Sequence, residues 1–310
     1  MKTILVTGGS GFIGRNLCER LACTVGKHSV YQLIVLSRNP SKAAKVLPQS
    51  VQTISDLSQL NQPIDILINL AGEPIADRRW SDKRKATIRQ SRIQTTQALY
   101  EYFKQADKPL SMVISGSAIG YYGGGIANDQ PVTEEGAVEP NFSSKLCADW
   151  ENTAKQFEQL GARVCFLRTG IVLGQQGALS KLLPAFKLGL GGPIASGRQW
   201  MPWIHIEDMV RIIIHAMQND ITGPINCTAP QPVTNREFAK TLGKVLKRPA
   251  IAPMPAAIVK LLFGQMGDEL MIQGQSVIPQ KLQQQGFEFN YSDLAGALSE
   301  LLGSSNHEAF

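Results

Sequence analysis

Apolar residues follow two different periods along the N-terminal part of the chain. Short continuous apolar runs, rich in Ile, Val and Leu, predict buried parallel strands at residues 4–6, 33–36, 51–54, 64–70, 110–115, 163–168 and 224–227. Longer segments with apolar residues three or four positions apart predict helices at about 12–25, 82–104 and 143–159. This alternation predicts an α/β fold built on a doubly wound parallel sheet.

The pattern changes after residue 172. A helix is predicted to open within 203–210, and from residue 232 onward short amphipathic helices, such as 235–246 and 255–263, are separated by Pro and Gly. These features predict a smaller, mostly helical C-terminal lobe. We assign residues 1–172 and about 204–228 to the sheet domain, and residues 173–203 and 229–310 to a lobe that would hold a substrate.

The turn after the first predicted strand carries three glycines, Gly8, Gly11 and Gly14, just before the first predicted helix. The first lets the chain turn sharply, the second lets backbone N–H groups approach a pyrophosphate, and the third packs helix against strand. The helix start at Phe12 and Ile13 would add free N–H groups and the positive end of the helix dipole. The position of this turn predicts dinucleotide binding in a Rossmann domain, and the alternative is a purely structural turn.

The second predicted strand ends at Ser37 and Arg38. In a dinucleotide-binding fold this position lies beside the adenosine ribose, where an acidic residue would accept bonds from a free 2′-hydroxyl. A serine and an arginine suit a 2′-phosphate instead. The sequence therefore predicts a preference for NADP(H) over NAD(H), against the alternative that Arg38 is an ordinary surface residue.

Other candidate cofactor contacts follow the later strands. Asp56 could accept a hydrogen bond from the adenine amino group or could cap the turn that follows it. Small residues after the fourth strand leave room for a ligand, because such sheets bind ligands at their carboxyl edge. The remaining candidates are Leu70, Ala71, Gly72, Glu73, Arg78 and Ser115.

The chain has 310 residues, 43% of them hydrophobic, and a net charge of +6. One segment is densely basic: Arg78, Arg79, Lys83, Arg84, Lys85, Arg89 and Arg92. It is interpreted as a solvated helix face, with a phosphate contact from one or two residues as the alternative. No nucleic-acid partner is expected, because no recognised motif or interleaved aromatic residue accompanies the segment. The basic excess suits a small anionic substrate.

The chain has five cysteines, an odd number, and no two of them have C-x-x-C spacing. They are therefore interpreted as small buried hydrophobic residues of a protein in the reducing cytoplasm. They are Cys18, Cys23, Cys147, Cys165 and Cys227. The four histidines are far apart, and no metal site is expected. No apolar run approaches the roughly 20 residues that span a bilayer, and no signal peptide precedes the first strand, so we expect no membrane partner.

Together these segments resemble the short-chain dehydrogenase/reductase superfamily, in its extended, nucleotide-sugar epimerase-like branch. The resemblance is carried by Thr7-Gly-Gly-Ser-Gly-Phe-Ile-Gly14, Leu70-Ala71-Gly72, Ser117-Ala-Ile-Gly-Tyr121 and Ile204-His-Ile-Glu-Asp208. Further segments resemble an atypical epimerase group: Ala71-Gly-Glu-Pro, Arg78-Arg-Trp80 and Leu188-Gly-Leu-Gly-Gly-Pro-Ile194. The match covers essentially the whole chain. It implies an NADP-type cofactor, a small-molecule substrate, and a homodimer formed through the helices at about 82–104 and 143–159.

The resemblance also implies a catalytic Ser, Tyr and Lys, with the last two spaced as Y-x-x-x-K. That spacing places Tyr and Lys on one helix face, where the lysine charge lowers the tyrosine pKa for proton transfer. Ser117 and Lys145 match this pattern, and Lys145 would also bind the nicotinamide ribose. The tyrosine position, however, is Asn141. An amide cannot serve as a general acid or base near neutral pH.

Three interpretations follow from this departure. Tyr121 or Tyr122, beside Ser117, supplies the proton; or Lys145 or a water does so in slow or unusual redox chemistry; or the protein binds NADPH without turnover as a regulator or sensor. Some relatives are described as cell-division inhibitors, which would be a use of the third kind. For both tyrosines the simpler alternative is aromatic packing against the nicotinamide pocket.

Three residues of the C-terminal part receive structural interpretations, and a fourth is a candidate for substrate binding. His205 is interpreted as a satisfied buried histidine, and Trp200 and Trp203 as packing residues of the lobe interface. Arg198 is a candidate for binding a substrate phosphate, because basic residues of this lobe do so in the epimerase-like branch.

Overall fold

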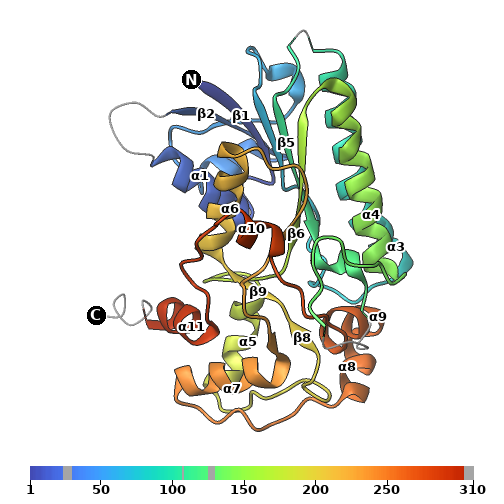
Figure 1. The fold of residues 1–310 in the computed structure, drawn as a ribbon, viewed down its shortest axis with the longest axis vertical. Coiled ribbons are helices and arrows are strands. Elements are labelled where there is room, and N and C mark those ends of the chain that lie inside the picture. The colour runs from blue at the N-terminus through green and yellow to red at the C-terminus, as the bar shows by residue number, and fades with distance from the viewer. Residues whose placement is uncertain (24–29, 107, 125–129, 304–310) are drawn as a thin grey trace.

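The computed structural model describes residues 1–23, 30–106, 108–124 and 130–303 (Figure 1). Its main sheet has seven parallel strands in the order β10-β6-β5-β4-β1-β2-β3. The strands are β1 (Lys2–Thr7), β2 (Tyr31–Leu36), β3 (Gln52–Ile54), β4 (Ile66–Asn69), β5 (Met112–Ala118), β6 (Arg163–Thr169) and β10 (Gly223–Cys227). The chain reverses its direction of winding between β1 and β4. In such sheets, ligands bind outside the carboxyl ends of the strands at this reversal.

Helices cover both faces of the sheet (Figure 1). They are α1 (Phe12–Ala22) and α6 (Ile206–Gln218) on one face, and α3 (Asp82–Lys104) and α4 (Phe142–Lys155) on the other. The first face buries Leu17 and Leu21 of α1 with Met209 and Ile213 of α6. The second face buries Leu99 and Phe103 of α3 among others. The doubly wound parallel sheet of a Rossmann-type α/β fold is therefore confirmed.

Shorter elements complete this part of the chain. They are α2 (Pro40–Ala44), η1 (Leu57–Gln59), η2 (Ile119–Tyr122), η3 (Gln156–Leu160) and α10 (Gln280–Gln284).

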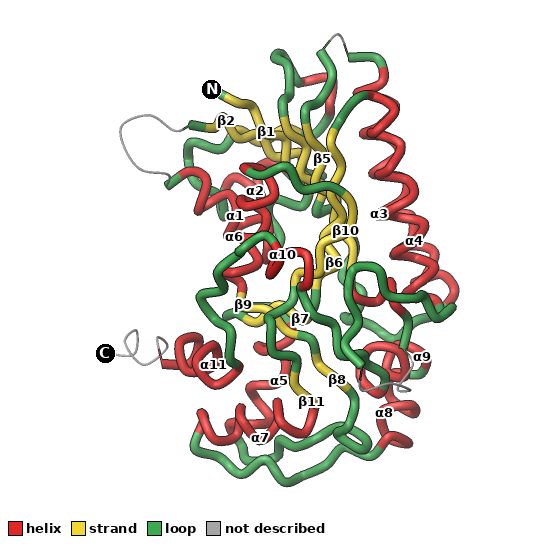
Figure 2. Tube along the Cα trace, in the orientation of Figure 1, coloured by secondary structure: helices red, strands yellow, loops and turns green. Residues whose placement is uncertain are grey.

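The remaining elements form a region below the carboxyl edge of the sheet, in which helices and loops predominate (Figure 2). They are β7 (Ile171–Leu173), α5 (Ala178–Lys187), β8 (Trp200–Met201), β9 (Trp203–His205), β11 (Val233–Thr234), α7 (Asn235–Leu246), α8 (Ala256–Phe263), α9 (Gln265–Gly267), the π-helix η4 (Asp268–Ile272) and α11 (Leu294–Gly303). A separate hydrophobic cluster joins Phe186, Trp203, Phe238 and Leu298 from these elements. This confirms the helical C-terminal region, while the exact division into two lobes stays a prediction.

Two helices have the predicted bounds, 82–104 and 235–246. Helix α1 ends at Ala22, and the predicted residues 24 and 25 lie outside the described residues. The prediction that β5 ends at Ser115 is wrong, because the strand continues to Ala118 alongside β6. The interpretation of every cysteine as buried is also wrong: Cys23, just after α1, is exposed, whereas the other four are buried.

Candidate functional site

The glycines between β1 and α1 are required by the geometry of the turn. Gly8 has a φ of +69°, and a Cβ there would lie 2.6 Å from the carbonyl oxygen of Leu70. A Cβ on Gly14 would lie 2.3 Å from the carbonyl oxygen of Gly8, so the first helical turn packs directly on the backbone of the loop. The N–H of Gly11 donates to the same carbonyl at 2.9 Å. Side chains at Gly8 and Gly14 would force this turn apart.

No side chain of the described residues caps the N-terminus of α1. Its cap residue is Gly11, and its first turn contains no acidic residue. The ring of Phe12 fills the space where side chains at Gly174 and Gly177 would lie. Free N–H groups at a helix N-terminus, together with the helix dipole, form an anion site.

The residues after β2 and β3 make local bonds at the same edge of the sheet. The Ser37 hydroxyl accepts the N–H of Asn39 at 3.2 Å, and Arg38 extends into solvent with 93% of its side chain exposed. Asp56 accepts the N–H of Ser58 at 2.9 Å and caps the turn that follows, which holds the pKa of its carboxyl below the ordinary value. The capping alternative is therefore observed, and an adenine contact of Asp56 stays a prediction.

The segment after β4 lies against the glycine turn. The N–H of Ala71 donates to the Thr7 hydroxyl at 3.2 Å, and that hydroxyl donates to Asn69 at 2.6 Å. Glu73 accepts hydrogen bonds from Arg38 at 3.2 Å and from Arg84 at 3.4 Å. The fold thus gathers the predicted residues from the ends of three neighbouring strands, β2, β1 and β4. Of the remaining candidates here, Leu70 is half-buried, whereas Gly72 and Arg78 are exposed.

The predicted catalytic residues are arranged differently from the pattern they resemble. Ser117 is 6% exposed, and its hydroxyl donates to Glu151 of α4 at 2.7 Å. Asn141 is the N-cap of α4: its side chain accepts the N–H of Ser144 at 2.8 Å. Lys145 lies exposed on the same helix. Ser115, a predicted cofactor contact, is fully buried within β5.

A buried polar network lies behind Ser117. Arg168 of β6 makes two bonds of 2.9 Å to the carboxylate of Glu151, and both side chains are less than 10% exposed. Arg168 also donates to the Tyr122 hydroxyl at 3.0 Å, which in turn donates to Asn226 at 2.6 Å. In each of these hydrogen bonds both the donor and the acceptor are side chains of the protein, so the polar groups of the network satisfy one another.

The two candidate tyrosines differ in their surroundings. Tyr122 is fully buried, and burial raises its pKa to about 12, so its enclosed hydroxyl is poorly suited to proton exchange with a substrate. Tyr121 is half-buried, and its ring packs on the Arg168 guanidinium with 3.4 Å between the guanidinium carbon and the ring centroid. Of the two, Tyr121 is the better placed to meet a ligand.

A second carboxylate reaches the site from the C-terminal region. Glu269, in the π-helix η4, accepts the N–H of Ser143 at 3.0 Å, the hydroxyl of Ser143 at 2.7 Å and the N–H of Phe142 at 3.4 Å. These groups form the first turn of α4, next to Asn141. π-Helical turns often occur at functional sites.

Sequence reasoning missed Glu151, Arg168 and Glu269. A signal existed for the first two, because each is a single charged residue within an apolar pattern: Glu151 between Trp150 and Ala154 on the buried face of α4, and Arg168 near the end of a buried strand. Two such charges of opposite sign predict a buried pair. No local signal marks Glu269.

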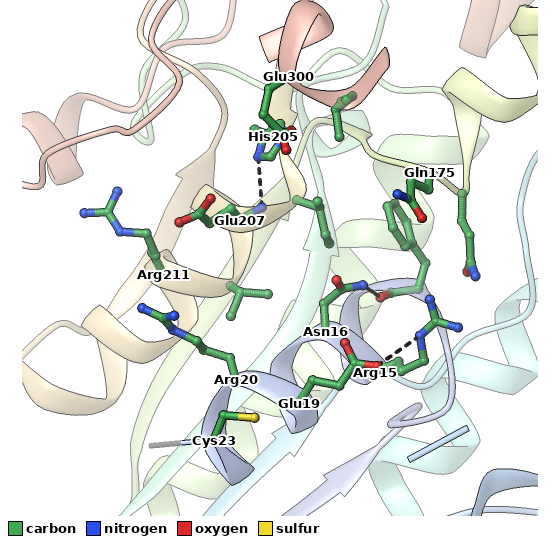
Figure 3. A pocket seen from close by; sticks show the side chains of 15 residues that line it. Arg15, Asn16, Glu19, Arg20, Cys23, Gln175, His205, Glu207, Arg211 and Glu300 are labelled. Carbon is green, nitrogen blue, oxygen red and sulfur yellow. Dashed lines mark hydrogen bonds and ion pairs between the residues drawn. The ribbon is translucent and has the colours of Figure 1, made fainter. Parts of the chain in front are cut away.

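An open groove of about 540 Å³ runs between α1, α6 and α11 (Figure 3). Its lining carries three arginines (Arg15, Arg20, Arg211) and three glutamates (Glu19, Glu207, Glu300). Of the predicted site residues only Phe12 lines it, so it is distinct from the site at the carboxyl edge. His205 also lines the groove; it is 3% exposed and accepts the N–H of Glu207, which confirms its interpretation as a satisfied buried histidine.

The part of the chain that the structure describes has neither a metal-binding cluster nor a membrane-spanning helix. No group of His, Cys, Asp and Glu side chains there could hold a metal ion. No described helix is both long enough and apolar enough to cross a bilayer.

Comparison with known proteins identifies two family models. The NAD dependent epimerase/dehydratase family matches residues 4–227, and a domain of unknown function matches residues 254–301. The epimerase family protein YfhF of Bacillus subtilis is 38% identical over 305 residues, covering 96% of this chain and 97% of that protein.

The chain also aligns with solved structures over nearly its whole length. The crystal structure of human epimerase family protein SDR39U1 with NADPH aligns with a TM-score of 0.86 and 33% identity, covering 97% of this chain and 99% of that one. A UDP-galactose 4-epimerase aligns with a TM-score of 0.75 at 19% identity, which shows a shared fold only.

Proposed function

The chain belongs to the NAD-dependent epimerase/dehydratase family, and on this premise we propose that it binds NADP(H) at the carboxyl edge of its sheet. The single observation that carries the proposal is the uncapped N-terminus of α1 at the winding reversal, with Arg38 exposed beside it. The human relative crystallised with NADPH supports the same cofactor.

The residues present fit this cofactor. The N–H groups of α1 around Phe12 and Ile13 would hold the pyrophosphate, since nothing in the helix itself satisfies them. Ser37 and Arg38 would hold the 2′-phosphate, and Lys145 the nicotinamide ribose. When bound, the cofactor supplies or accepts a hydride.

The chemistry we favour is hydride exchange with a small substrate, in the class of nucleotide sugars or related anionic compounds. Because the single proton of Ser117 is donated to Glu151, Ser117 can only accept a hydrogen bond, and a substrate hydroxyl would be its partner. Tyr121 would exchange a proton with the substrate oxygen, since the Asn141 amide cannot act as a general acid or base.

A second candidate function is cofactor binding without turnover, in a regulatory or sensing role. The bonds of Asn141 and Ser117 favour it, because both side chains are engaged within the protein: Asn141 caps α4 and Ser117 donates to Glu151. In this case the conformation or a partner would respond to bound NADPH.

Two measurements test these proposals. Calorimetric titration of the protein with NADPH and NADH should give tighter binding of NADPH, and absence of heat with both would remove the proposal of cofactor binding. Absorbance should then be followed with NADPH and a panel of carbonyl compounds and nucleotide sugars. Turnover that is lost in Tyr121→Phe but kept in the matched control Tyr102→Phe supports hydride exchange. Tight NADPH binding with no turnover on the whole panel supports the regulatory function.

A further inference from the structure

An ion pair crosses the carboxyl end of the central strand β1. Arg38 follows β2 and Glu73 follows β4, and β1 lies between these two strands. Thr7, the last residue of β1, is in register with Leu36 on one side and Asn69 on the other. The Arg38 Nη2 to Glu73 Oε1 bond of 3.2 Å therefore spans the edge at which the glycine turn begins.

The two partners are held very differently. The Arg38 side chain is 93% exposed, whereas that of Glu73 is 23% exposed. The N–H of Glu73 donates to Ser91, its carbonyl accepts from Arg92, and its carboxylate also accepts from Arg84 at 3.4 Å. Glu73 is thus the fixed partner, and Arg38 is the one that can change partners.

The Glu73 carboxylate has two arginine partners, Arg38 and Arg84. Hydrogen bonds from Arg38 and Arg84 keep the pKa of the Glu73 carboxyl below its ordinary value, so Glu73 is an anion at neutral pH. If Arg38 turns to another anion, Arg84 still pairs with the Glu73 carboxylate. An exposed ion pair is weak, and the 2′-phosphate carries a larger negative charge than a carboxylate, so it can displace Glu73 from the Arg38 guanidinium.

We propose that Glu73 is a specificity-determining residue, which competes with the cofactor 2′-phosphate for Arg38. Binding of NADPH exchanges the Arg38–Glu73 pair for an Arg38–phosphate pair, and Arg84 retains Glu73. NADH has no 2′-phosphate and leaves the pair as it is. The inference rests on the proposed function, since it needs a dinucleotide at this edge.

A double-mutant cycle tests the exchange. The affinities for NADPH, NADH and 2′,5′-ADP are measured by calorimetry on wild type, Glu73→Gln, Arg38→Gln and the double variant. Glu73→Gln should bind NADPH and 2′,5′-ADP about fivefold more tightly, the upper range for an exposed ion pair, with NADH within about twofold of wild type. The gain should disappear in the Arg38→Gln background. Glu101→Gln, at an exposed residue of α3, is the control for the same change in net charge and should alter none of the three affinities.

The outcomes separate the inference from the proposed function. If wild type binds neither dinucleotide, the proposed function fails. If it prefers NADPH but Glu73→Gln leaves NADPH binding unchanged or weaker, the exchange is wrong and the proposed function stands. An equal gain with and without Arg38 would mean simple charge repulsion, and would also overturn the exchange.

Discussion

Helices α1 and α4 both begin at the carboxyl edge of the sheet, yet their first turns are completed in opposite ways. At α1 the cap residue is Gly11, and neither a side-chain cap nor an acidic residue is present in the first turn. At α4 the side chain of Asn141 accepts one N–H, and the carboxylate of Glu269 accepts two more. The chain leaves one anion site open and fills the other with its own atoms.

The charged residues near the two helices repeat this contrast. Arg38, near α1, is almost fully exposed, whereas Arg168, near α4, is 3% exposed and bound to Glu151. The region around α1 therefore has unfilled helix N–H groups and an exposed, weakly paired arginine, and the region around α4 is stabilised by buried internal bonds. We expect mutations around α1 to affect cofactor affinity, and mutations in the buried network and the N-cap of α4, as distinct from exposed Lys145, to affect folding stability.

The largest effect is expected from Arg168→Met. It leaves the Glu151 carboxylate buried without its partner, which typically lowers the free energy of unfolding by about 3–5 kcal/mol. Urea denaturation followed by circular dichroism measures the loss, and NADPH affinity of the folded fraction should stay near wild type. Arg89→Met, which breaks the exposed pair with Asp149, is the control and should cost at most about 1 kcal/mol. A loss as small for Arg168→Met would contradict a structural role of the network.

The second-largest effect is expected at the glycine turn before α1, the helix whose cap residue is Gly11. Gly14→Ala places a Cβ 2.3 Å from a backbone oxygen, so the turn must shift away from its binding geometry. NADPH affinity should fall at least about 100-fold, equivalent to about 2.8 kcal/mol, as measured by calorimetry. Gly303→Ala, at a glycine where an added Cβ would have no atom of the described residues within 4 Å, should bind normally. Normal binding by Gly14→Ala would place the cofactor elsewhere.

Arg38→Ala tests the charge beside α1. The loss of one charge-assisted bond to phosphate should weaken NADPH binding about tenfold to 100-fold and leave NADH unchanged. Lys45→Ala, an exposed cation next to α2, controls for general charge. An equal loss of affinity for both dinucleotides would show that Arg38 does not bind the 2′-phosphate.

Asn141→Ala tests the side-chain cap at the N-terminus of α4. Removal of an N-cap acceptor should cost about 1 kcal/mol in the free energy of unfolding, with NADPH affinity unchanged. Asn141→Ser keeps an acceptor and should recover most of the stability. A fall in NADPH affinity instead of stability would give Asn141 a place in the cofactor site.

The smallest effect is a pH dependence at α6, whose first turn is capped by His205. Burial lowers the pKa of His205 in the folded state, although its bond to Glu300 opposes this. Below the unfolded-state pKa of about 6.5 the unfolded chain binds more protons, so stability should be complete above it and fall as the pH decreases. His215 has a lowered pKa for the same main reason and acts in the same direction.

The difference between wild type and His205→Asn isolates the contribution of His205. Asn retains a capping oxygen but does not titrate, so the variant should lose stability less steeply between about pH 7.5 and pH 5.5 in urea denaturation. Equal slopes would show that His205 contributes nothing to this dependence.

Much of the fold follows from local sequence. The apolar runs predict all seven strands of the main sheet, and the glycine spacing predicts the turn at Gly8, because φ preference and strand burial depend on residues close in the chain. Although the helices at 235–246 and 256–263 follow from the local pattern, some short elements after residue 172, among them α5 and β8, do not. Their patterns are brief, and they are stabilised by packing in the Phe186–Trp203–Phe238 cluster rather than by local preference.

The candidate site divides in the same way. The sequence by itself determined the α/β sheet, the open turn before α1, the Arg38 position and the absence of tyrosine at Asn141. Only the tertiary structure decided that Ser117 donates to Glu151, that Glu73 pairs with Arg38, and that Glu269 caps α4 from 126 residues away. Hydrogen bonds and ion pairs act over a few ångströms, and the fold sets which distant residues come within that range.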